Sequence, residues 1–292
     1  MNKKLSILLG ASVLVAGLSL NAQDQVQSKE VKSVQNKIEK STNKSVDDKR
    51  QKMMKEAIET INQTVLALKA LDDGKKKEAI DILAKVSGKI DLIVARDPAL
   101  KLLPVSISQK QIDVLVTKDM IKSLLYDATK ALKDGKVQEA RHMLQNLASE
   151  IVITTTSIPL ATYPDDIKAI APLIDKDKID EAKIALQAVL NSLVVSEQVI
   201  PLPILRATFL LKNAEDLAQK AKRDKKENED LDKLLNEASY QLEMAELLGY
   251  GSEDEFSAIY KQIDIIKEKT TNNNSGNGWF DKVKEKISKL TK

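Results

Sequence analysis

The sequence contains no cysteine, and that absence excludes several classes of protein together. Disulfide-stabilised scaffolds, thiol nucleophiles and thiolate metal sites all depend on this side chain. A lipoprotein anchor is excluded as well, because its lipid is attached to cysteine. The 292 residues must therefore be held by packed cores, and they suffice for one large or two smaller domains.

Histidine is nearly absent too, with His142 as the single example. One histidine cannot build a histidine-based zinc site. The chain has no Gly-x-Ser-x-Gly motif to present a serine nucleophile, and Gly249 and Gly251 lack the rest of any phosphate-binding loop. We expect no enzyme activity, no catalytic residue, no cofactor and no metal. A pH sensor at His142 is one hypothesis, because imidazole titrates at about pH 6.5, and an ordinary surface residue is the simpler one.

Aromatic residues are scarce, at 3%, whereas charged residues reach 30%. This composition is typical of helical bundles and helical repeats, since sheet proteins favour aromatic side chains. The charges are balanced, with 46 Lys and Arg against 43 Asp and Glu. Nucleic acid would need a concentrated positive face, so we expect no nucleic-acid partner.

Residues 1–22 have the pattern of a secretory signal peptide. Lys3 and Lys4 precede an apolar run over residues 5–20, and small side chains suit cleavage after Ala22. An apolar run of about 16 residues is short for a membrane span, which needs roughly 20. An uncleaved anchor is the alternative. We expect an exported protein of the periplasm.

Two further segments flank the expected helical domain of residues 49–269. Residues 23–48 are polar and lysine-rich without a consistent apolar face, which predicts a flexible spacer or a frayed helix. Residues 270–278 have the composition of a flexible linker. Residues 279–292 form a basic amphipathic helix that could contact a membrane surface or dock on protein. Its apolar face consists of Trp279, Phe280, Val283, Ile287 and Leu290.

A repeated motif organises the domain. Residues 71–79, 132–140 and 174–182 each end a helix, turn, and begin a second helix with Glu-Ala. The copies start 61 and 42 residues apart, so they form no regular solenoid. We expect them to stack on one another to bury their faces. The expected inward positions of the second helices are Ala79, Leu83, Val86 and Ile90; Ala140, Leu144, Leu147 and Ile151; and Ala182, Leu186, Val189 and Leu193.

The third copy departs from the other two. Its turn has Asp177 where they have glycine, and Pro172 lies inside its first helix. Proline removes a backbone donor and crowds the preceding turn, so we expect this helix to kink or break.

Connections rich in β-branched residues and proline follow the second helices. They cover residues 90–107, 151–163 and 193–204, and we expect extended segments there, with a small sheet as an option. Three C-terminal helices follow, of which the last begins with a capping box of Ser252 and Glu255. The expected fold is mainly α: an irregular helical-repeat bundle of three helix–turn–helix units plus C-terminal helices, with a minor β element.

The order of several short motifs resembles the YfdX family of exported bacterial proteins over roughly residues 50–267. The motifs are the turns at Ala70–Ala79 and Ala131–Ala140, Asp97-Pro98, Leu103-Pro104-Val105, Thr155, Ile158-Pro159-Leu160, Val199-Ile200-Pro201-Leu202, Ala245-Glu246 and Leu248-Gly249-Tyr250-Gly251. The residue Asp177 and the tail from Trp279 onward depart from this pattern. The resemblance implies a periplasmic, mainly helical, non-enzymatic protein linked to envelope and acid stress, with chaperone-like or small-molecule binding.

Two functional hypotheses follow. The first is a stress protein that binds unfolded clients or small molecules and forms a homo-oligomer. The second is an envelope scaffold or peripheral membrane protein that acts through its repeats and terminal helix. An acid response would depend on buried or interfacial carboxylates that gain protons as pH falls, because the chain has 43 acidic residues and one histidine.

Overall fold

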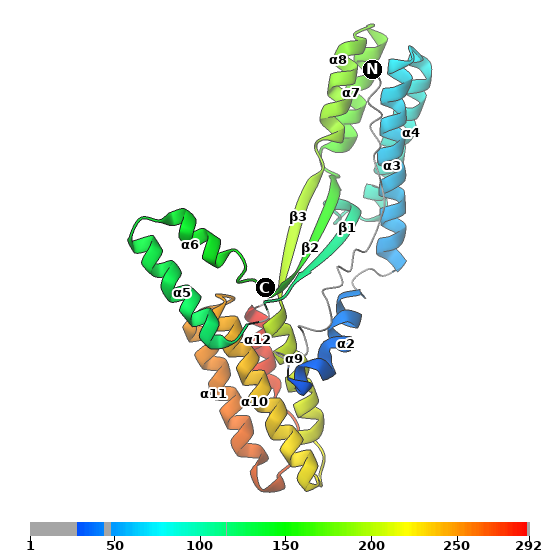
Figure 1. The fold of residues 1–292 in the computed structure, drawn as a ribbon. Helices are drawn as coiled ribbons and strands as arrows, with labels where there is room; N and C mark the ends of the chain where they lie inside the picture. The colour runs from blue at the N-terminus through cyan, green and yellow to red at the C-terminus, as the bar shows by residue number, and fades with distance from the viewer. Residues whose placement is uncertain (1–27, 44–47, 115, 291–292) are drawn as a thin grey trace. The chain divides into compact units, whose positions relative to one another are not determined.

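The computed structural model describes residues 28–43, 48–114 and 116–290 (Figure 1). The signal peptide expected at residues 1–22 lies outside these ranges. In chain order the elements are α2 (Lys29–Asn43), α3 (Asp48–Asp72), α4 (Lys76–Arg96), β1 (Leu102–Ile112), α5 (Lys118–Lys133), α6 (Val137–Leu144), β2 (Glu150–Pro159), α7 (Tyr163–Asp175), α8 (Ile179–Leu190), β3 (Val194–Pro201), α9 (Leu202–Ala218), α10 (Lys225–Leu247), α11 (Glu253–Thr270), η1 (Thr271–Asn273) and α12 (Asp281–Leu290). The predicted fold class, mainly α with a minor β element, is confirmed.

The minor β element is a three-stranded sheet in the order β1-β2-β3. Its strands arise from the three proline-bearing connections that were expected to be extended. Pro104 lies in β1, an edge strand, where a missing backbone donor is tolerated. Pro159 and Pro201 are the last residues of β2 and β3.

The chain divides into two compact units, and the boundary falls within each strand. Among the described residues, the first unit contains residues 48–109 and 153–198. The second contains α2, residues 110–152 and residues 199–290. The first and third copies of the repeat therefore belong to one unit and the second copy to the other.

The first unit is a four-helix bundle made by the first and third copies (Figure 1). Helix α3 packs against α4 and α8, and α7 packs against α4 and α8. The predicted inward positions Ala79, Leu83, Ala182 and Leu186 are each no more than 3% exposed. Stacking of repeats is thus confirmed for two copies, whereas the second copy takes no part in this core.

The three turns between paired helices share one geometry. Gly74, Gly135 and Asp177 have φ angles of 74°, 75° and 62°. In each turn the next residue donates its backbone N–H to a carbonyl five residues earlier, as Lys75 does to Ala70 at 2.8 Å. This is a Schellman motif, which needs the left-handed conformation at the turn residue. Asp177 adopts it without glycine, because aspartate tolerates that region better than most side chains do.

Two details of the repeats correct the predictions. Helix α7 continues through Pro172, which lies in its last turn, so the one backbone hydrogen bond that proline removes does not break the helix. Helix α6 is short and ends at Leu144, which is 37% exposed. Ile151, predicted to face inward from that helix, lies instead in β2, where β-branched neighbours favour a strand.

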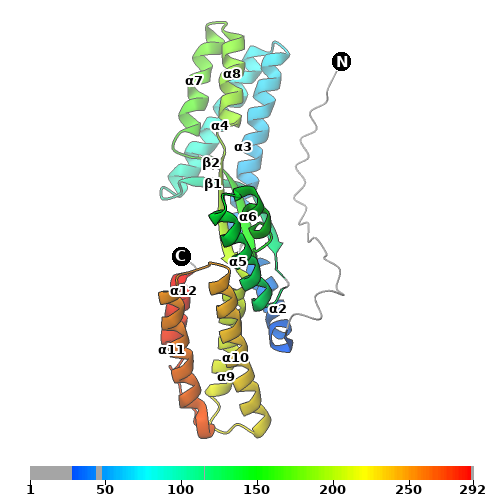
Figure 2. The same cartoon turned by 60° about the vertical axis from the view of Figure 1, so that its left-hand side comes forward.

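The second unit is built around α9, α10 and α11, which lie side by side in Figures 1 and 2. The predicted capping box of Ser252 and Glu255 starts α11. Helix α2 packs on α9 and buries Val31, Val34 and Ile38. Those three residues form an apolar stripe, so this part of the segment expected to be a spacer or frayed helix packs as a regular helix.

The second copy, α5–α6, is a hairpin within the second unit. Its internal contact is made by Ala128, Ala131 and Ala140, each no more than 5% exposed, with Met143 beside them. Helix α5 is attached to α10, where the ammonium of Lys118 pairs with Glu243 and lies 4.6 Å from the ring centroid of Tyr240.

Candidate functional site

A buried ion pair joins α9 to the end of β1. The Arg206 guanidinium donates to both carboxylate oxygens of Asp113, at 2.5 and 3.2 Å. The two side chains are only 6% and 5% exposed. The Ser149 hydroxyl, just before β2, donates to Asp113 at 2.7 Å. Because a buried charge is costly unless it is paired, these contacts fix the loop ends to α9.

Tyr250 extends this cluster from the turn after α10. Its hydroxyl oxygen accepts the backbone N–H of Ser149 at 2.9 Å, and its proton is donated to the Glu150 carboxylate at 2.9 Å. Burial raises the pKa of the Tyr250 hydroxyl above its ordinary value, and neighbouring Glu150 raises it further. Tyr250 therefore remains protonated and serves as a hydrogen-bond donor.

The centre of the cluster is buried, whereas Glu150 and Tyr250 at its edge are partly exposed. Ser149 is 1% exposed and Arg206 is 5% exposed, so their polar side-chain groups are directed to Asp113 rather than to solvent. The role of the cluster is to hold four segments of the second unit together. In the part of the chain that the structure describes, no group of His, Cys, Asp and Glu side chains is arranged to hold a metal ion.

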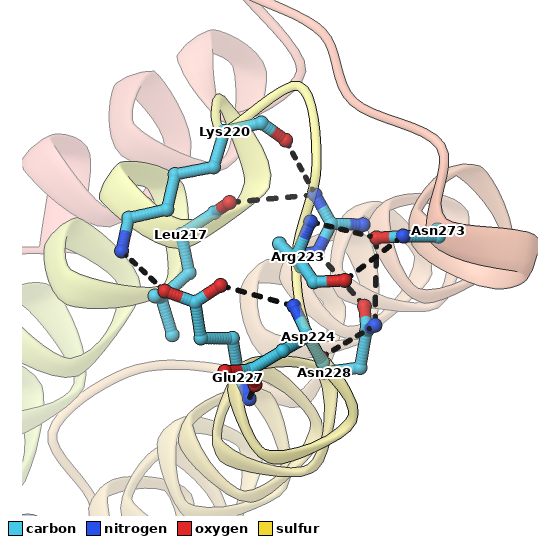
Figure 3. Close-up of polar contacts among 7 residues, drawn as sticks. All are labelled: Leu217, Lys220, Arg223, Asp224, Glu227, Asn228 and Asn273. Atoms are coloured by element: carbon cyan, nitrogen blue, oxygen red, sulfur yellow. Dashed lines mark hydrogen bonds and ion pairs between the residues drawn. The ribbon is translucent and has the colours of Figure 1, made fainter.

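A second polar cluster is centred on Arg223, which is 4% exposed (Figure 3). Its guanidinium donates to the backbone carbonyls of Leu217, Ala218 and Lys220, which end α9 and follow it. It also donates to the carbonyls of Thr270 and Asn274. A cation beside the carbonyl ends of α9 and α11 satisfies groups that have no partner within a helix.

The segment predicted to be a linker, residues 270–278, is attached through this cluster. Asn273 accepts the backbone N–H of Arg223 at 3.2 Å and donates to its carbonyl at 3.0 Å (Figure 3). Asn272 and Asn273 have φ angles of 54° and 62°, which asparagine tolerates well. The asparagine run that resembles a flexible linker in composition makes an ordered turn.

The terminal helix α12 docks on α11 and α9. Phe280, Val283 and Ile287 are no more than 4% exposed, and Trp279 and Leu290 are partly buried. Of the two settings considered for this apolar face, the structure shows docking on protein. Among the described helices, none is long and apolar enough to cross a membrane.

The histidine and the carboxylates considered for pH sensing lie on different helices. His142 is exposed on α6, with its Nδ1 atom 2.9 Å from Nε2 of Gln145. A hydrogen bond from Arg96 lowers the pKa of the Glu56 carboxyl below its ordinary value. The pKa values of Glu227 and Glu255 are likewise lowered by hydrogen bonds, from Lys220 and Ser252 respectively. These carboxylates therefore keep their charge to a lower pH than free glutamate does.

The hollows on the surface are modest. One of about 740 Å³ runs along the exposed first turns of α4, beside Lys75, Lys76 and Lys77. Another, of about 200 Å³, lies between α3 and the end of α4, beside Met53 and the Glu56–Arg96 pair. The second is smaller than the roughly 300–1,000 Å³ typical of small-molecule sites.

Exposed apolar side chains gather on the α5–α6 hairpin. These are Met120 (53% exposed), Tyr126 (72%), Leu132 (50%), Val137 (55%) and Leu144 (37%). Met120, Tyr126 and Leu132 are six residues apart in turn on α5, so the five side chains cover more than one face of the hairpin. Their number on two short helices makes the hairpin a candidate interaction surface. This hairpin is the candidate functional site.

Sequence reasoning missed Asp113 and Arg206, although an arginine inside the apolar stretch of residues 202–211 is a usable signal. Tyr250 belongs to one of the motifs that resemble the family, but the sequence alone gave it no role.

Comparison with known proteins finds a match to one family model. The family model described as YfdX protein matches residues 60–199, a range that contains all three turns of the repeat. The chain is also similar to a solved structure of YfdX from Salmonella Typhi, with 14% identity and a TM-score of 0.34. That likeness covers 50% of this chain and 91% of the other. No curated protein matches the chain.

Proposed function

We propose, from the match of residues 60–199 to the YfdX family model, that the chain is a non-enzymatic stress-response protein of the periplasm with chaperone-like or ligand-binding activity. Acid and envelope stress are the conditions that the family resemblance implies. The signal-peptide pattern of residues 1–22 supports export.

The observation that carries the binding activity is the exposed apolar surface of the α5–α6 hairpin. Met120 and Tyr126 are more than half exposed and protrude from α5. A methionine adapts to partners of different shape, and a tyrosine supplies a large apolar contact area. Unfolded polypeptides, which expose apolar side chains, match such a surface better than a small molecule does.

Suppression of client aggregation tests this proposal. The purified protein should slow the aggregation of an acid-unfolded model client, and a Met120→Ser, Tyr126→Ser variant should lose most of that activity. Ile184→Ser is the matched control, because Ile184 is 67% exposed on α8 and lies outside the hairpin. If the double variant protects the client as well as the parent chain does, the hairpin is not the client-binding surface.

The alternative is an envelope scaffold or peripheral membrane protein, for which α12 would have to leave its docked position. Liposome sedimentation separates the two. Deleting the whole tail would also remove partners of Arg223, so Trp279→Ser is the cleaner variant. Binding to anionic vesicles that the parent chain shows and Trp279→Ser lacks would support membrane association.

A further inference from the structure

The α5–α6 hairpin lacks the partner that its two sequence equivalents have. In the first unit, the first helix of each hairpin lies against the second helix of the other: α3 on α8, and α7 on α4. The two copies are therefore related by an approximate two-fold axis, and each uses the same face. Within the described part of the second unit, no other helical hairpin faces α5–α6 in this way.

The last turn of the first helix shows the difference. Leu71 in the first copy and Ile174 in the third are each 2% exposed in the bundle core. Leu132 occupies the equivalent position of the second copy, one residue after a buried alanine, and is 50% exposed. The sequence motif and the turn geometry are shared, so the missing burial reflects the missing neighbour.

The second helix of each hairpin shows the same difference in burial. Leu83 and Leu186 are 3% and 0% exposed, whereas their equivalent Leu144 is 37% exposed. Val137 is 55% exposed, and its third-copy equivalent Ile179 packs against the bundle core. The face that pairs the other copies is thus apolar and uncovered in α5–α6.

We propose that this face of α5–α6 pairs with the same face of a second copy of the chain. The pairing reproduces between chains the two-fold contact that the first and third copies make within one chain. Helix α5 of one subunit lies on α6 of the other, and Leu132, Val137 and Leu144 become buried. The product is a four-helix bundle assembled from two hairpins.

The size of the face and its charge determine how strong this self-association can be. A standard interface buries about 800 Å² per partner over some 20–30 residues. Helices of 16 and 8 residues, of which one face takes part, provide less than that and predict a weak, reversible dimer. The hairpin carries six basic and four acidic residues between Lys118 and Leu144, so charges of both signs are present and bulk repulsion is small.

One like-charge contact makes the proposal sharply testable. In the first unit, the Lys183 ammonium lies 2.8 Å from the Asp72 carboxylate across the two copies. The equivalent residues of the second copy are Lys133 and Arg141. Two-fold pairing therefore places Lys133 of each subunit near Arg141 of the partner subunit. A Lys133→Asp change turns both repulsive contacts into ion pairs and should tighten the dimer.

Sedimentation velocity of the purified protein over a concentration series measures this association. Leu132→Asp should weaken dimerisation by about 100-fold or more, because two charges would be buried per dimer. Lys133→Asp should strengthen it by about three- to tenfold. Tyr126→Asp and Lys130→Asp are the matched controls, since their side chains lie outside the pairing face, and both should associate as the parent chain does.

Three outcomes overturn the proposal: a monomeric parent chain throughout the series, a Leu132→Asp variant that still dimerises, or a Lys133→Asp variant that dimerises more weakly. Circular dichroism guards against misfolding, because Leu132 is half exposed in the monomer and its replacement should leave the thermal transition unchanged. Client protection by Met120 and Tyr126 is measured separately, so the loss of one activity does not decide the other.

Discussion

Removing the Asp113 carboxylate should destabilise the second unit strongly. In Asp113→Ala the Arg206 guanidinium stays buried without its two carboxylate bonds of 2.5 and 3.2 Å. Both side chains are about one-twentieth exposed, so little water replaces the lost partner. Breaking one side of such a pair costs about 3–5 kcal/mol. At a typical slope of about 2 kcal/mol per molar urea, the midpoint should fall by about 1.5–2.5 M.

The single tryptophan gives a direct assay. Trp279 belongs to the second unit and lies 5.8 Å from the Lys269 ammonium, measured to the ring centroid. Its fluorescence during urea unfolding therefore reports on that unit. Glu229→Ala is the control, because Glu229 is more than half exposed and its contact with Lys225 is 4.0 Å long. That variant should leave the midpoint nearly unchanged.

A double variant separates the two contributions to this loss. Asp113→Leu combined with Arg206→Met removes both charges, and replacing a buried pair by apolar side chains is often neutral or stabilising. We expect its midpoint to return close to that of the parent chain. If Asp113→Ala shifted the midpoint no more than Glu229→Ala does, or if the double variant were worse than the single one, the reasoning about burial would be refuted.

Three further predictions concern other parts of the chain. Gly74→Ala should cost about 1–2 kcal/mol in urea unfolding of the first unit, since a Cβ there meets no atom within 4 Å and only the positive φ is strained. In Glu56→Gln, stability should fall at neutral pH and depend less on acidification. The pKa of Glu56 is lowered in the folded state, so its charge stabilises the parent above the ordinary value of 4.5, and this contribution disappears as pH falls through the folded pKa. A parent and variant with parallel profiles below about pH 5 would contradict this. Arg223→Lys should accelerate amide exchange in α12, because one ammonium cannot reach the carbonyl ends of both α9 and α11.

The parts of the fold that could be predicted from the sequence depend on local patterns. The Gly74 and Gly135 turns, the Ser252 capping box and the proline-bearing strands all depend on residues a few positions apart. Asp177 shows the limit of such rules, since its turn forms without glycine. Local periodicity also identified the apolar face of α12, but it left two possible neighbours for that face.

Long-range partners could not be predicted. Asp113 and Arg206 are 93 residues apart, and neither belongs to a spaced motif. Arg223 and Asn273 are 50 residues apart in segments whose composition resembles a solvated turn and a flexible linker. The exposure of the α5–α6 face could not be predicted for a different reason. Its motif matches that of two hairpins that are buried, and only the structure shows that its partner is missing.

The interleaving of the two units along the chain imposes an order of assembly. Helices α3 and α4 leave the ribosome long before α7 and α8, and the whole α5–α6 hairpin is synthesised between them. Until α7 and α8 emerge, the core positions Leu71 and Leu83 lack the third-copy helices that complete their burial. Folding of the second unit is completed later still, because α12 and the segment that contacts Arg223 are translated after its other helices. Neither unit can finish as an early, independent domain, so a nascent chain carries uncovered apolar surface through most of its synthesis.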